Sequence, residues 1–83
     1  MKIFTFSQDE QDFVIKEDSK IIGIVSFQNQ GVYPIRWATI ELNEQNSGQI
    51  MYPGDIVIFS EARDIYIKKP YRPTKIFARR IEL

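Results

Sequence analysis

The chain of 83 residues contains no cysteine and no histidine. The lack of Cys excludes disulfides and thiolate metal sites, and it fits a reducing compartment. The lack of His removes the commonest metal ligand and the side chain that usually titrates near neutral pH. The common activated nucleophiles and acid–base pairs of enzymes are therefore missing. We expect a protein that is not an enzyme and that uses no metal and no cofactor.

Long apolar runs are also lacking. The N-terminal residues turn polar from Ser7 onward, so no run there has the length of a secretion signal. No run elsewhere approaches the roughly 20 apolar residues of a membrane-spanning helix. These features predict a cytoplasmic protein with no membrane contact.

Short runs of Ile, Val, Phe and Tyr alternate with polar turn clusters, which is typical of β-strands. A hydrophobic content of 43% and an aromatic content of 13% suffice for a packed core, which disordered chains lack. No segment is a convincing helix. The pattern predicts strands at residues 2–6, 13–16, 20–27, 32–42, 56–60, 64–69 and 75–83.

The order of strands and turns predicts a single all-β domain over residues 1–83. Residues 20–27 are apolar on both faces and should form a central strand that bends at Gly23. Residues 17–19 and 61–63 look like hairpin loops, and Pro53-Gly54 suits a type II turn. We expect six to eight short antiparallel strands in a small β-barrel or sandwich, SH3-like or OB-like, because closure protects strand edges.

Charge is divided unevenly along the chain. Residues 62–83 carry seven cations and two anions, for a net charge of +5, while residues 1–61 carry a net charge of −5. The formal net charge of zero therefore conceals two oppositely charged parts. A localised positive patch attracts polyanions or acidic protein surfaces whatever the net charge.

This basic segment is the strongest functional signal in the sequence. If residues 64–69 and 75–83 pair as a hairpin, and a one-residue bulge at Arg79-Arg80 turns both arginines outward, one surface collects the cations. Such a surface would bind phosphates, with tyrosines stacking on bases, and RNA or single-stranded DNA is preferred because no recognition helix is present. The candidates for binding nucleic acid or an acidic partner are Lys68, Lys69, Arg72, Lys75, Arg79 and Arg80, and the stacking candidates are Tyr66 and Tyr71.

Three alternatives remain open. The cations could pair with the chain's own acidic residues, among which Asp9, Glu10 and Asp12 form a cluster. They could instead dock on an acidic protein surface, which would make the chain an inhibitor or adaptor. A phage-type accessory protein that blocks a host or defence enzyme would be of this kind. Finally, the positive end of one copy could meet the negative end of another, giving a structural subunit or a homo-oligomer.

Overall fold

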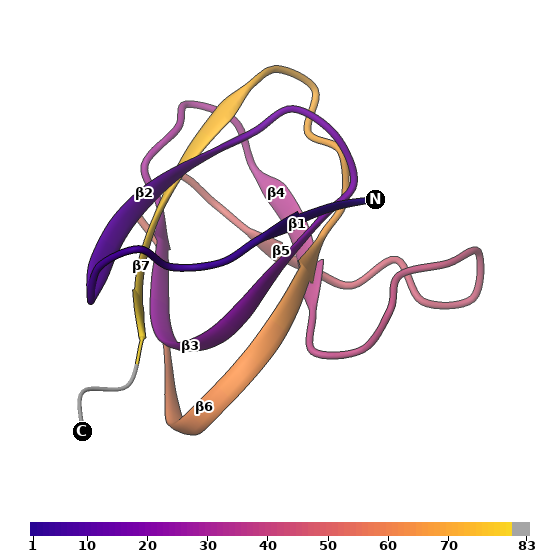
Figure 1. Cartoon of the computed structure of the whole chain (residues 1–83). Helices are drawn as coiled ribbons and strands as arrows, with labels where there is room; N and C mark the ends of the chain where they lie inside the picture. The colour runs from indigo at the N-terminus through magenta and orange to yellow at the C-terminus, as the bar shows by residue number, and fades with distance from the viewer. Residues whose placement is uncertain (81–83) are drawn as a thin grey trace.

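The structure describes residues 1–80, which contain seven strands and no helix. The structure is a computed structural model, shown in Figure 1. The prediction of an all-β chain with six to eight strands is confirmed. The strands are β1 (Lys2–Phe4), β2 (Glu10–Ile15), β3 (Ser19–Asn29), β4 (Ile35–Ala38), β5 (Gln49–Met51), β6 (Ile56–Ile67) and β7 (Thr74–Arg80).

Strand β3 is the centre of one sheet, as its two apolar faces predicted. The strand order is β2-β7-β3-β6-β4-β5, and β1 adds to β3 as well. Pairing is antiparallel except between β1 and β3, which run parallel. The first part of β3 lies between β1 and β6, and its second part lies between β7 and β6.

Both long strands bend, and the bends fold the sheet over (Figure 1). Gly23 has a φ of 69°, which suits glycine and confirms the predicted bend in β3. On β6, the register with β3 jumps from Ile24↔Arg63 to Ser26↔Ile58, so residues 59–62 bulge away from β3. The folded sheet encloses the core between its two parts but does not close into a ring among residues 1–80.

The core is built from the inward faces of the strands. Phe27 of β3 meets Trp37 of β4 edge to face, with ring centroids 4.9 Å apart, and Trp37 meets Phe59 of β6 at 5.9 Å. Edge-to-face aromatic pairs add about 0.5–1.5 kcal/mol each to the stability that burial supplies. The other buried apolar residues include Phe13, Ile15, Ile21, Ile24, Ile35, Met51, Ile65, Ile67, Ile76 and Ala78.

Several local predictions need correction. Residues 56–60 and 64–69 do not form a hairpin around 61–63, because one long bent strand, β6, covers most of this stretch. Residues 17–19 do not close a hairpin either, because β7 lies between β2 and β3. The strand predicted at 32–42 is only Ile35–Ala38. The turn at Pro53-Gly54 is confirmed: Gly54 has a φ of 88°, and the Asp55 N–H donates to the Tyr52 carbonyl at 3.0 Å.

Candidate nucleic-acid interface

The predicted basic hairpin does not exist, because β3 separates β6 from β7. The six candidate cations therefore fall into two groups. We call residues 68–73, which connect β6 to β7, the basic loop, and it carries Lys68, Lys69 and Arg72. The other three cations lie on β7 and form the β7 group: Lys75, Arg79 and Arg80.

The β7 group is paired with acidic residues in β2 and just before it. The Arg79 guanidinium lies 3.1 Å from the Glu10 carboxylate, and these residues are cross-strand neighbours. Arg80 Nε donates to Asp9 Oδ1 at 2.9 Å. The third pair joins Lys75 Nζ to Asp12 at 3.8 Å. The acidic cluster of the sequence thus neutralises half of the candidate cations.

Both arginines of the β7 group are exposed, as predicted, but the predicted bulge lies elsewhere. Ile24 and Ser26 of β3 pair with Arg80 and Arg79, so the extra residue is Val25, on the neighbouring strand. The prediction depended partly on residues 81 and 83, which lie outside the described residues. The bulge in β3 belongs to the bend at Gly23, and β7 itself stays regular beside it.

The basic loop differs from the β7 group in its ion pairing. Within residues 1–80, no carboxylate lies within 4.0 Å of the side-chain nitrogens of Lys68, Lys69 or Arg72. The backbone of the loop is nevertheless held in place. The Lys69 N–H donates to Asp18 Oδ1 at 2.7 Å, and the buried Thr74 donates its hydroxyl to the Arg72 carbonyl at 2.8 Å.

Tyr71 is the exposed aromatic residue of the basic loop. Its exposed fraction is 79%, and one side of its ring contacts Tyr33, with centroids 5.4 Å apart. The Arg72 guanidinium lies 5.7 Å from the same ring, within the range of a cation–π contact. Tyr71 therefore offers an aromatic surface next to positive charge.

Tyr66, the other stacking candidate, is engaged elsewhere. It is half-buried on β6, and the Lys20 ammonium lies 5.1 Å from its ring. A hydrogen bond with Tyr66 raises the pKa of Lys20, and the nearby carboxylate of Asp64, at 3.7 Å, acts in the same direction. The structure therefore does not bring Tyr66 into the basic loop.

Arg36 is a cation that the sequence reading missed. The Lys68 N–H donates to the Arg36 carbonyl at 2.9 Å, which continues the pairing of β4 with β6. Two cations directly opposite each other on adjacent strands repel. The Arg36 guanidinium donates to the Gly48 carbonyl at 3.4 Å. The signal was absent from the sequence, because only the strand register makes Arg36 a neighbour of Lys68.

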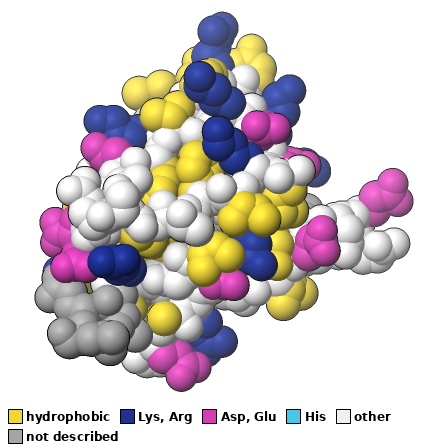
Figure 2. Space-filling model, in the orientation of Figure 1, with side chains coloured by type: hydrophobic (Ala, Val, Ile, Leu, Met, Phe, Trp, Pro, Cys, Tyr) yellow, Lys and Arg dark blue, Asp and Glu magenta, His cyan; other side chains and the backbone are white. Residues whose placement is uncertain are grey.

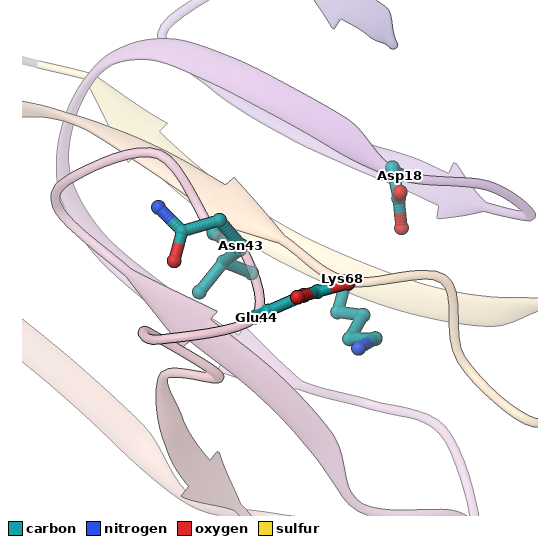
Figure 3. Close-up of a pocket in the computed structure, with 5 residues that line it drawn as sticks. Asp18, Asn43, Glu44 and Lys68 are labelled. Carbon is teal, nitrogen blue, oxygen red and sulfur yellow. The ribbon is translucent and has the colours of Figure 1, made fainter.

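A polar hollow of about 240 Å³ lies beside Lys68 and is lined by Asp18, Leu42, Asn43 and Glu44 (Figure 3). In this view the Glu44 side chain points toward Lys68. The acidic side chains limit the positive patch on this side. Figure 2 shows Lys and Arg side chains gathered at the top of the molecule, at the end where the basic loop lies in Figure 1.

Two further properties bear on the site. Residues 1–80 contain no group of three or more Asp, Glu, His or Cys side chains placed to hold a metal ion. The same residues include no helix long and apolar enough to cross a membrane. No protein-family model matches the chain, and no curated protein or solved structure matches it.

Proposed function

We propose that this protein is a non-catalytic binding protein that binds single-stranded RNA or DNA through the basic loop. One observation carries the proposal. Lys68, Lys69 and Arg72 lack carboxylate partners within the described residues, and Arg72 lies beside the exposed ring of Tyr71 in the same loop. Cations that no intramolecular partner neutralises are available to phosphates.

The chemistry of the loop suits a single strand. Lys and Arg side chains neutralise phosphates and release counterions, which supplies most of the sequence-independent affinity. A base can stack on Tyr71, and aromatic stacking tolerates any base. Residues 1–80 form no helix that could enter the major groove of a duplex. We infer from the bent strands that the folded sheet is OB-like. OB folds bind single-stranded nucleic acids.

The β7 group has a secondary place in this proposal. Binding through Arg79 or Arg80 would first require breaking a charge-assisted contact of 3.1 or 2.9 Å. Each such surface pair contributes only about 0–1 kcal/mol, so a phosphate could displace it at low salt. We expect the β7 group to contribute less affinity per cation than the basic loop.

A salt titration tests the proposal. The affinity for a fluorescently labelled oligo(dT) or oligo(U) is measured by anisotropy over a series of salt concentrations. Three phosphate contacts at about 0.7 per contact predict a slope of about −2 for log affinity against log salt. A slope near −4 would show that all six cations bind phosphates and would contradict the division into two groups.

Two other outcomes would overturn the proposal more broadly. If no oligonucleotide binds at low salt, the basic loop is not a nucleic-acid site. If a polyglutamate peptide binds under conditions in which the oligonucleotides do not, the same cations instead recognise an acidic protein surface, as an inhibitor or adaptor would.

A further inference from the structure

One edge of strand β6 carries backbone groups without a partner strand. The Asn29 N–H donates to the Asp55 carbonyl, and Phe27 pairs with Val57, so these residues direct their backbone groups toward β3. The alternation of an antiparallel ladder then directs the N–H and C=O groups of Ile56 and Ile58 to the opposite edge. Within residues 1–80, β4 pairs with β6 only at Tyr66 and Ile67, so this edge is free.

The other sheet edges are protected against pairing with another chain. Strands β1 and β5 have three residues each, and β2 carries the ion-paired carboxylates of Glu10 and Asp12. Short strands and charges are the usual devices that prevent edge pairing. The edge at Ile56 and Ile58 carries no charged side chain, and the bulge at residues 59–62 limits its length.

The side chains at this edge are apolar and exposed. Ile56 is 57% exposed and Ile58 is 78% exposed, although both lie within a strand. They border a hollow of about 240 Å³ that Phe77 also lines. An exposed strand edge next to an apolar surface fits an added β-strand better than it fits a small ligand.

We propose that the occupant of this edge is a second copy of the chain, whose β6 pairs antiparallel with the first β6 about a two-fold axis. Two identical edges pair in this way without strain in either copy, and the resulting interface is closed. The formal net charge of zero means that two copies do not repel each other overall.

The sequence of β6 favours one register. When Val57 lies opposite Val57 of the second copy, Ile56 lies opposite Ile58 of that copy, and the exposed isoleucines cover one another. A register shifted to place the two copies of Ile58 opposite each other would bring Asp55 against Glu61, and like charges directly opposite are unfavourable. The first register also lies outside the bulge at residues 59–62.

The proposed dimer is independent of the proposed nucleic-acid site. The free edge is at the start of β6, whereas the basic loop follows its end at Ile67. One short strand pair is a small interface, so we expect a dissociation constant of roughly 10⁻⁵ to 10⁻⁴ M. Dimerisation would double the number of basic loops per particle without covering them.

Sedimentation velocity over a concentration series tests the dimer. The mass should rise from 9.8 kDa to twice that value, and the rise should persist at about 1 M salt, where charges are screened beyond about 3 Å. Ile58→Lys should keep the chain monomeric. Val14→Lys, at a residue that is 49% exposed on β2, should still form the dimer. A monomer at all concentrations, or a dimer that high salt or Val14→Lys abolishes, would overturn the proposal.

Two further measurements test the geometry. The amides of Ile56 and Ile58 should exchange rapidly in dilute protein and become protected as the dimer forms. The chain has no Cys, so Val57→Cys introduces a single thiol. The proposed register places it opposite the same thiol of the second copy, at a separation that suits a disulfide. Ala62→Cys is the matched control and should not cross-link. Equal cross-linking of both variants, or a dimer in which the Ile58 amide still exchanges rapidly, would refute the β6 edge.

Discussion

Asn29→Ala would remove a buried amide that joins three segments of the chain. Asn29 is fully buried at the end of β3, and its Nδ2 donates to the carbonyls of Tyr33 at 2.9 Å and Met51 at 3.1 Å. Its Oδ1 accepts the Gly31 N–H at 2.9 Å. The amide therefore holds the end of β3, the turn after it and β5 together.

The expected loss of stability follows from these bonds. Only the bond to the Met51 carbonyl is buried, and a buried acceptor that loses its partner costs about 1–3 kcal/mol. The two part-buried bonds contribute about 0.5–1.5 kcal/mol each, so Asn29→Ala should cost at least about 2 kcal/mol in total. A domain of 83 residues has a total stability of about 4–12 kcal/mol, so the variant should lose a large part of it. The melting temperature should fall by at least about 8 °C, at about 4 °C per kcal/mol.

Thermal and urea unfolding, followed by circular dichroism and Trp37 fluorescence, measure this change. Gln30→Ala is the matched control, because Gln30 is exposed and its side chain donates only to Gln28. It should change stability by less than about 0.5 kcal/mol. If Asn29→Ala costs less than about 1 kcal/mol, the reasoning from buried hydrogen bonds is refuted. A folded Asn29→Ala variant should also bind oligonucleotide less well, because Tyr33 packs against Tyr71.

Three other changes have defined outcomes. Glu10→Gln removes the carboxylate beside Arg79, so it should steepen the salt slope of oligonucleotide binding by about 0.7 and change stability by less than about 1 kcal/mol. An unchanged slope would count against the neutralisation of the β7 group by the acidic residues of the chain. Tyr71→Ala should weaken oligonucleotide binding by about 1–3 kcal/mol in the anisotropy assay, whereas Tyr52→Ala, at an exposed tyrosine on a separate turn, should not. Gly48→Ala should lower the free energy of unfolding in urea more than Gly54→Ala does. Both glycines have positive φ, but only at Gly48 would a Cβ meet the Trp37 carbonyl, at 2.5 Å, so equal losses of stability would contradict this steric argument.

The sequence predicted those elements that local pattern controls. Alternation of apolar residues identified the strands, and the positive φ that Gly23 and Gly54 permit identified a bend and a turn. The sequence predicts two strands in place of the long strand β6, because residues 61–63 carry two charges and read as a turn. That segment is instead a bulge at the place where the sheet folds over, so tertiary structure overrides a local turn signal.

The candidate site was only partly predictable, because it depends on which strands are neighbours. Composition alone identified the cations of the C-terminal segment. It could not show that β2 pairs with β7 and places Glu10 opposite Arg79, or that Lys68 lies opposite Arg36. Both facts depend on long-range register, which short strands of similar composition specify weakly in the sequence.

Two triple variants with the same change in charge test the central claim most directly. Lys68, Lys69 and Arg72 are replaced by Ala in one, and Lys75, Arg79 and Arg80 in the other, and oligonucleotide affinity is measured by anisotropy at one low salt concentration. If the basic loop is the binding site, the first variant should lose binding and the second should retain most of it. Equal losses would show that net charge alone attracts the oligonucleotide, and a larger loss in the second variant would contradict the account.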